Sequence, residues 1–379
     1  MSVLLQGDSP ALVLDSHKLG LHMDRVEAWD RGERIAPVTV DMALTRACSA
    51  RCAFCYAMVQ ESQERHGITE THAKHLLDDF REVGVRGVSL VSDGESTLSK
   101  AYVPFVQHAK SIGLDVAQAT NGWEFAPEKQ AQVLPHMTWL RFTVAAGTPA
   151  GYSRIMFKGP EHTQVFDRAM SHIRHAVEFK RKHGLSVTLG IQMVLMPEFK
   201  DEILPFAQLG VDLGVDYAVI KHCSDDEWGS LGVNYKDYEA LYPLLEQAEA
   251  LSTDQTKVIV KWNKIEAEGV APYQRFYGPQ FLLQLSGSGL LAPAGQFFNA
   301  RYSKFHIGDI TEERFKDLFK SERYWRTMHY LASERFDART MMGTLPISHY
   351  VSTALDRHRK GIEAITPWHG PEPLHRNFL

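Results

Sequence analysis

Short apolar runs alternate with amphipathic stretches between about residue 36 and residue 223 of the chain. The apolar runs are rich in β-branched residues, as buried strands are, and the stretches between them repeat apolar residues at helical spacing. A glycine closes each helical stretch, where a left-handed C-terminal cap would require it. The predicted strands cover residues 37–44, 86–92, 114–120, 139–145, 186–195 and 215–221, and the predicted helices cover residues 71–84, 101–113, 166–184 and 202–214.

This alternation of strands and helices predicts a parallel sheet with right-handed crossover connections. About six strand–helix units are present, which is fewer than a closed TIM barrel has. We therefore predict an α/β fold, a partial (β/α)6 TIM-like barrel over residues 36–230. An N-terminal extension of residues 1–35 precedes it.

The pattern changes after residue 223. We expect a helix over 234–251, a strand over 258–262 and a hairpin over 281–293 that turns at Ser286–Gly289. Short helices are expected near residues 311–319 and 322–332. These elements predict a smaller α+β domain over residues 231–379, ending in a proline-rich tail.

Composition narrows the function classes. The 379 residues are 44% hydrophobic and 23% charged, and the formal net charge is -5 without a block of Lys or Arg. Neither nucleic acid nor a membrane is therefore expected as a partner. No apolar run reaches the roughly 18–20 residues that span a bilayer. The N-terminus lacks a basic region ahead of its apolar stretch, so we expect a cytoplasmic protein.

Three of the four cysteines lie together, directly after the first predicted strand. Their spacing is Cys48-x3-Cys52-x2-Cys55. Thiolates are the ligands of iron–sulfur clusters, and three of them would leave the fourth iron of a cubane open to another ligand. The alternatives are a structural zinc site, which usually needs a second Cys/His pair at fixed spacing, and three incidental cysteines.

The loop resembles the CxxxCxxC signature of the radical SAM superfamily, with Phe54 where that motif commonly has an aromatic residue. After the second strand, Asp93-Gly94-Glu95 resembles the family's GGE segment. The resemblance implies that this segment binds the amino group of S-adenosylmethionine (SAM).

Two further segments carry the same resemblance. Thr120 and Asn121 begin a TNG motif at the end of the third strand. After the fourth strand, Thr143 stands where the family has a serine that contacts the SAM carboxylate, and Ala145 replaces the usual acidic residue. Arg154, expected in the loop after that strand, is a further candidate for the SAM carboxylate or for the substrate.

The resemblance implies an enzyme that holds one 4Fe-4S cluster on Cys48, Cys52 and Cys55 and binds SAM at the open iron. The reduced cluster cleaves SAM to a 5′-deoxyadenosyl radical, which abstracts a hydrogen atom from the substrate. An electron donor such as flavodoxin or ferredoxin is implied as a partner.

The C-terminal region resembles a SPASM or twitch domain over residues 289–295 and 305–324. Members with that domain usually have cysteines there for auxiliary clusters, but no cysteine follows Cys223 in this sequence. Ala294 and the segment 340–350 occupy the corresponding places. We therefore expect a single cluster and a redox-neutral reaction such as epimerisation, elimination or rearrangement.

Candidates for the substrate side lie at the end of the sixth predicted strand. Cys223 is either a buried small side chain or a thiol that returns a hydrogen atom to a substrate radical. Lys221 shares its face of the strand and is expected to bind an anionic or hydroxylated group. His222 points the other way and is expected to be structural. Gln192 is a further candidate.

Three functions remain open from the sequence. The first is a radical SAM enzyme that acts on a small polar metabolite, such as a sugar, aminosugar or amino-acid derivative. The second is a peptide-modifying enzyme that uses a separate recognition protein. The third is a non-catalytic iron–sulfur protein.

Overall fold

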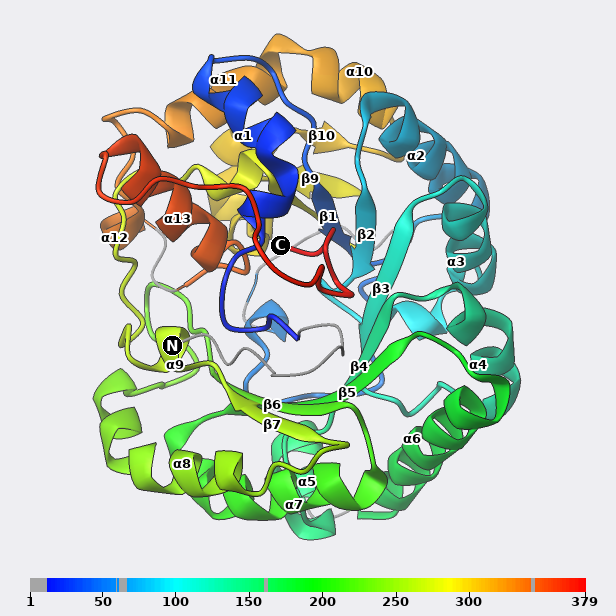
Figure 1. The fold of residues 1–379 in the computed structure, drawn as a ribbon. Helices are drawn as coiled ribbons and strands as arrows, with labels where there is room; N and C mark the ends of the chain where they lie inside the picture. Colours follow the sequence, from blue (N-terminus) through cyan, green and yellow to red (C-terminus); the bar gives the residue numbers. More distant parts are fainter. Residues whose placement is uncertain (1–11, 59, 61–66, 160–162, 342–344) are drawn as a thin grey trace. The chain divides into compact units, whose positions relative to one another are not determined.

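The computed structural model describes residues 12–58, 60, 67–159, 163–341 and 345–379 (Figure 1). The chain divides into two compact units. The first comprises residues 1–46, 60–117 and 270–379, and the second comprises residues 47–59 and 118–269. The domain ranges expected from the sequence stay a prediction.

The first unit contains a sheet in the order β10-β9-β8-β1-β2. Strand β1 (Thr39–Met42) pairs in parallel with both β2 (Gly87–Leu90) and β8 (Leu282–Leu285). Strands β9 (Leu290–Ala292) and β10 (Gly308–Asp309) continue it in antiparallel pairs. The helices of this unit are η1 (Leu19–His22), α1 (Met23–Asp30), α2 (Glu70–Val83), η3 (Ser96–Leu98), α3 (Tyr102–Ser111), η8 (Gly278–Gln280), η9 (Gly295–Phe298), η10 (Ala300–Phe305), α10 (Phe315–Lys320), α11 (Glu322–Leu331), α12 (Ala338–Met341) and α13 (His349–Arg359).

The second unit contains strands β4 (Trp139–Thr143), β5 (Thr188–Leu195), β6 (Tyr217–His222) and β7 (Lys257–Val260), paired in parallel in that order. Strand β3 (Asp115–Thr120) contributes its first half to the first unit and its second half to this one. The helices are η2 (Tyr56–Met58), α4 (Pro127–Val133), η4 (Leu134–His136), α5 (Pro149–Phe157), α6 (Thr163–His183), η6 (Pro197–Glu202), α7 (Ile203–Leu213), η7 (Tyr235–Leu241), α8 (Tyr242–Ala250) and α9 (Trp262–Ile265).

Helix α2 shows how the local sequence sets these elements. The hydroxyl of Thr69 accepts the N–H of His72 and caps the first turn. Gly84 ends the helix at a φ of 99°, a left-handed conformation that favours glycine. Between these caps, Leu76 and Phe80 recur at helical spacing and are buried.

The expected fold class is confirmed: the structure is an α/β protein with a parallel sheet that forms an open, partial barrel. All six predicted strands are present, and so is the hairpin, formed by β8 and β9. Two further strands, β7 and β8, also pair in parallel, beside β6 and β1. The expectation that Arg154 lies in a loop was wrong, because Thr148 and Pro149 start helix α5 there.

The C-terminal tail, which has no periodicity in the sequence, is anchored at the start of two strands, β1 and β3. The carbonyl oxygen of Asn377 accepts the hydroxyl of Thr39, and its amide donates to Asp115 over 2.7 Å. The ammonium of the buried Lys18 donates to the carbonyl oxygen of Phe378. The tail is therefore held against the N-terminal ends of β1 and β3.

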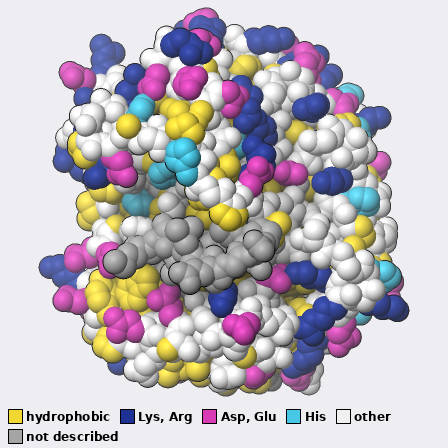
Figure 2. Space-filling model, in the orientation of Figure 1, with side chains coloured by type: hydrophobic (Ala, Val, Ile, Leu, Met, Phe, Trp, Pro, Cys, Tyr) yellow, Lys and Arg dark blue, Asp and Glu magenta, His cyan; other side chains and the backbone are white. Residues whose placement is uncertain are grey.

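Acidic and basic side chains are interspersed over the face shown in Figure 2 rather than gathered into separate patches. Within the described ranges, no helix combines the length and the apolar character needed to cross a bilayer.

Candidate functional site

The cysteine loop follows β1 and, from residue 47 onward, belongs to the second unit. Cys48 is exposed, Cys52 and Cys55 are half-buried, and all three are thiols rather than disulfides. The N–H of Cys55 donates to the carbonyl oxygen of Cys52 over 3.2 Å, which closes a turn between the two. Three soft thiol ligands on one short, accessible loop fit a 4Fe-4S cluster with one open iron.

Within the part of the chain that is described, no three His, Cys, Asp or Glu side chains converge to hold one metal ion. In a 4Fe-4S cluster, each cysteine binds a different iron. Such a cluster therefore does not require the three thiols to converge on a single point.

Helix α5 holds the cysteine loop through the carbonyl oxygens of its last turn. The N–H of Arg51 donates to Met156 over 2.9 Å, and the N–H of Ala53 donates to Ile155 over 2.8 Å. The Cys52 thiol lies 3.7 Å from the sulfur of Met156. The last carbonyl groups of a helix have no intrahelical partner. The hydrogen bonds from Arg51 and Ala53 therefore satisfy these carbonyls and also hold the cysteine loop in place.

The other end of α5 is fixed by the buried carboxylate of Glu202. This carboxylate accepts the N–H of Gly147 over 2.9 Å, and the N–H and hydroxyl of Thr148 over 3.0 and 2.7 Å. Gly151 passes so close that a Cβ there would lie 1.9 Å from a carboxylate oxygen of Glu202. Glu202 therefore sets the position of helix α5, whose last turn is hydrogen-bonded to the cysteine loop.

Asn121, at the end of β3, connects directly to the cysteine loop. Its amide nitrogen lies 3.0 Å from the hydroxyl oxygen of Ser49 and 4.0 Å from the sulfur of Cys48. Its amide oxygen accepts the N–H of Trp123 over 2.9 Å, which fixes the direction of the amide. An N–H pointed at a ligand sulfur is one of the features that set the potential of an iron–sulfur cluster.

Cys223 lies buried just beyond the end of β6, beside the cysteine loop. Its sulfur is 3.7 Å from the carbonyl oxygen of Phe54, and its backbone N–H donates to Leu195 over 2.9 Å. The hydroxyl oxygen of Tyr238 accepts the same N–H over 3.0 Å. Burial raises the pKa of the Cys223 thiol to about 12, so the thiol keeps its hydrogen at neutral pH.

Lys221 is the second candidate on this strand. Burial, together with the nearby charges of Lys264 and Arg141, lowers the pKa of its ammonium to about 7. The neighbouring His222 is buried and makes contacts inside the protein. Its Nδ1 lies 2.5 Å from the carbonyl oxygen of Lys264, and its ring packs edge-on against Tyr235.

Asp93 of the DGE segment lies in the first unit and is buried. Its carboxylate accepts the hydroxyl of Ser286 over 2.6 Å and the N–H of Gly287 over 2.8 Å. The guanidinium of Arg46 pairs with it at 3.0 Å. Burial raises the pKa of Asp93, while these donors oppose that shift. The side chain thus anchors the β8–β9 turn.

Gly94 and Glu95 also have defined structural settings. Gly94 has a φ of 114°, and a Cβ there would lie 2.1 Å from the carbonyl oxygen of Thr45, so only glycine fits. The carboxylate of Glu95 accepts the N–H and the hydroxyl of Thr97 over 3.2 and 2.7 Å. Both acidic side chains thus form hydrogen bonds inside the protein. The backbone of residues 93–95 is therefore the part of the segment that we expect to bind SAM, as the resemblance implies.

Three further positions of the predicted site region, Thr143, Ala145 and Arg154, lie at or after the end of β4. Thr143 is half-buried at the end of the strand, and Ala145 has a φ of 60°, which is uncommon for a residue with a side chain. Arg154 in α5 is exposed, pairs with Asp201 at 3.0 Å and lies over the ring of Phe199. Its role toward SAM or the substrate stays a prediction.

Asp93, Gly94 and Glu95 lie in the first unit, and the other predicted site residues lie in the second. Sequence reasoning missed three residues near the site. Arg141 could have been found, because it shares the strand face of Thr143. Glu202 and Lys264 lie in short helical segments whose sequence carries no signal of their contacts.

The predicted SPASM or twitch likeness stays a prediction. Ala294, where relatives with auxiliary clusters would have cysteine, is buried two residues after the end of β9. Residues 342–344 of the segment 340–350 lie outside the described residues.

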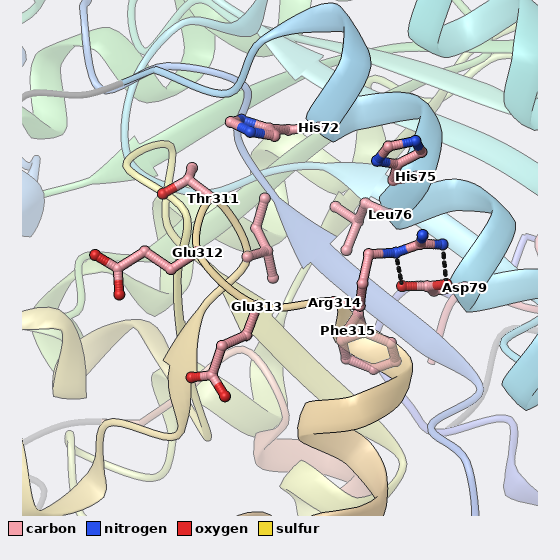
Figure 3. Close-up of a pocket in the computed structure, with 10 residues that line it drawn as sticks. His72, His75, Leu76, Asp79, Thr311, Glu312, Glu313, Arg314 and Phe315 are labelled. Atoms are coloured by element: carbon pink, nitrogen blue, oxygen red, sulfur yellow. Dashed lines mark hydrogen bonds and ion pairs between the residues drawn. The ribbon is translucent and has the colours of Figure 1, made fainter.

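A separate cavity of about 220 Å³ lies in the first unit, between α2 and the segment before α10. Figure 3 shows His72 and His75 on one side and Glu312 on the other. Arg314 pairs with the buried Asp79 through two hydrogen bonds of 2.5 and 2.9 Å. The pair ties α10 to α2, and none of the predicted site residues lines this cavity.

Comparison with known proteins gives a consistent set of relatives. Residues 42–209 match the family model of the radical SAM superfamily. An AdoMet-dependent heme synthase of Methanosarcina barkeri (strain Fusaro / DSM 804) is 22% identical over 308 residues, which cover 77% of this chain and 85% of the relative. An Fe-coproporphyrin III synthase of the same organism is 30% identical over 108 residues, 28% of this chain and 25% of that relative.

Among solved structures, Streptococcus suis SuiB bound to S-adenosylmethionine has the same fold. Its TM-score is 0.61 at 12% sequence identity, and the match covers 81% of this chain and 72% of that chain.

Proposed function

Because the chain belongs to the radical SAM superfamily through residues 42–209, we propose that it abstracts a hydrogen atom from a small polar metabolite, such as a sugar, aminosugar or amino-acid derivative. The chain is a radical SAM enzyme, and its family uses a 4Fe-4S cluster and SAM. The proposal for the substrate is supported by the cysteine loop beside Cys223 and Lys221.

When bound, the reduced cluster and SAM supply a 5′-deoxyadenosyl radical. The residues of this chain hold and shape that site. Cys48, Cys52 and Cys55 would bind three irons. Asn121 directs its amide toward the Cys48 sulfur, and the end of helix α5 fixes the backbone of the loop.

Cys223 is proposed to return a hydrogen atom to the substrate radical. In this step the S–H bond breaks and a C–H bond forms, which leaves a thiyl radical on Cys223. One electron from a flavodoxin- or ferredoxin-type donor and one proton then restore the thiol. The raised pKa of the Cys223 thiol supports this role, because a thiolate has no hydrogen to give.

The net reaction is proposed to be redox-neutral, as in epimerisation, elimination or rearrangement. No cysteine follows Cys223 in the sequence, so the C-terminal region offers no thiolates for an auxiliary cluster that could accept an electron from the substrate.

A tetrapyrrole is a second candidate substrate class. The names of the two Methanosarcina barkeri relatives, heme synthase and Fe-coproporphyrin III synthase, favour it. Peptide modification with a separate recognition protein is the remaining enzymatic alternative.

Anaerobic reconstitution tests the proposed chemistry. We expect about four irons per chain, and release of 5′-deoxyadenosine when dithionite and SAM are added. A variant with serine at Cys48, Cys52 and Cys55 should lose both. Zinc without iron, or iron without any 5′-deoxyadenosine, would contradict the proposal, and about eight irons would contradict a single cluster. Product formation from sugars, aminosugars or Fe-coproporphyrin III then separates the substrate classes.

A further inference from the structure

The sheet of the second unit has one face that carries unusually polar side chains. Ile191 and Ala218 lie on the opposite face, since a Cβ on Gly210 of α7 would touch both. Successive strand residues point to alternate faces, so Gln192 and Lys221 point away from α7. We call this side the inner face.

Strand register fixes the neighbours on the inner face. Thr143 of β4 is level with Gln192 of β5, and Arg141 is level with Gly190. Tyr217 of β6 is level with Gly190 of β5, and its ring covers this glycine. A Cβ at Gly190 would lie 2.3 Å from the ring. Lys221 stands four positions further along β6, on the same face. The inner face therefore presents an arginine, a lysine and an amide around a tyrosine ring.

Positive charge accumulates at this place. Lys264, from the short helix α9 beside β6, is buried, and its charge acts on Lys221 together with that of Arg141. Among the residues that the structure describes, no carboxylate forms an ion pair with Lys221. Buried and half-buried like charges repel each other and lose part of their hydration, so an anion beside Lys221 would stabilise its ammonium.

Gln192 adds an unused acceptor. Its side chain is 4% exposed, and its Oε1 receives no hydrogen bond within the described ranges. A buried amide oxygen without a donor is unfavourable, and a bound molecule with a hydroxyl or N–H group would correct this.

We propose that the inner face binds an anionic group of the substrate, a carboxylate or a phosphate, through Lys221, Arg141 and Lys264, with Gln192 accepting a neighbouring hydroxyl or N–H. The inference rests on the proposed function in that the bound molecule is the substrate of the radical reaction. Arg141 supplies a planar pair of donors that suits an oxyanion, and the two lysines supply compact charges.

Binding of small probes tests this site without knowledge of the substrate. The reconstituted holoenzyme is titrated anaerobically at constant ionic strength with succinate, with inorganic phosphate and with the uncharged succinamide, and its Tm is followed. We expect succinate or phosphate to raise the Tm and succinamide to have no effect. The anion that raises the Tm more shows whether the site prefers a carboxylate or a phosphate.

Substitutions assign the effect to the inner face. In Lys221→Met and Arg141→Met the anion-induced shift should fall at least about five-fold, whereas Lys221→Arg should retain it. Lys182→Met, at an exposed lysine of α6, is the matched control and should respond like the wild type. Without any probe, Lys221→Met should be at least as stable as the wild type, because it removes a half-buried charge that lies near Lys264 and Arg141.

The proposal is overturned if the Tm of the wild type does not respond to either anion, or responds equally to succinamide. It is also overturned if Lys221→Met keeps the full anion-induced shift in Tm, or if this variant is clearly less stable than the wild type. Release of 5′-deoxyadenosine without substrate is measured on the same samples. If this release persists while anion binding fails, the anion site is wrong and the radical chemistry stands. If anion binding persists and only the release fails, the radical chemistry is wrong and the anion site stands.

Discussion

The sulfur of Cys223 lies 3.7 Å from the carbonyl oxygen of Phe54, although 169 positions separate the two residues in the sequence. Phe54 is the neighbour of Cys55 in the cysteine loop, so this contact places the thiol beside the candidate cluster ligands. The end of β6 thus meets the loop after β1 within one compact unit. A hydrogen-atom donor would have to be held at such a place.

Replacement of Cys223 tests its role as donor. In Cys223→Ala we expect 5′-deoxyadenosine release to continue and formation of the redox-neutral product to fall at least about 100-fold. For an epimerisation run in D2O, the wild-type product should carry one solvent deuterium, since thiols exchange their hydrogen with water. Unchanged product yield, or a product without deuterium, would show that Cys223 is structural.

Removal of the Asn121 amide should alter the cluster. In Asn121→Ala the N–H directed at the Cys48 sulfur is lost, so we expect the midpoint potential of the reconstituted cluster to fall. Potentiometric titration followed by EPR measures this change, at an iron content equal to that of the wild type. Thr120→Val, which removes the neighbouring hydroxyl, serves as a comparison. A potential identical to that of the wild type would contradict the assigned contact.

Loss of the Glu202 carboxylate should loosen helix α5 and, through it, the cysteine loop. Glu202→Ala removes the acceptor of three hydrogen bonds inside the protein. We expect a loss of about 2–3 kcal/mol in the free energy of unfolding, in line with buried charged acceptors, and faster release of iron to a chelator. Glu198→Ala, at an exposed position of η6, is the control. Normal stability with normal iron retention would refute this positioning role.

The depressed pKa of Lys221 predicts a pH dependence of stability. The pKa is about 7 in the folded protein and 10.5 in its ordinary state, so between these values the unfolded chain binds more protons. Stability should therefore rise with pH above about 7, by at most about 1.4 kcal/mol per pH unit. The groups that act on Lys221 are Lys264, Arg141 and Cys223; the Cys223 thiol, with a pKa of about 12, does not titrate in this range.

Urea unfolding of wild type and Lys221→Met between pH 6.5 and pH 9 measures this effect. The difference in stability between the two proteins should shift in favour of the wild type as the pH rises. Parallel profiles would mean that the ammonium of Lys221 stays protonated throughout, with an anionic partner in the protein.

The sequence alone was sufficient for the parallel α/β fold, and it predicts the cluster loop. Strand residues buried on both faces form continuous apolar runs, and helix ends carry local caps such as Thr69 and Gly84, so both are visible without tertiary information. The spacing of Cys48, Cys52 and Cys55 is likewise local, because all three ligands lie on one loop. The motifs at Asp93 and Asn121 are predicted from local sequence for the same reason.

Contacts between distant segments were decided only by the tertiary structure. Strand β8 pairs with β1 across more than 200 positions of sequence, and the C-terminal tail is anchored at Thr39. Nothing in the local pattern near Glu202 or Lys264 shows that one supports α5 and the other adds its charge to Lys221. Hydrogen bonds and charge interactions of this kind depend on which segments the fold brings together, and that depends on packing of the whole chain rather than on the periodicity of any part of it.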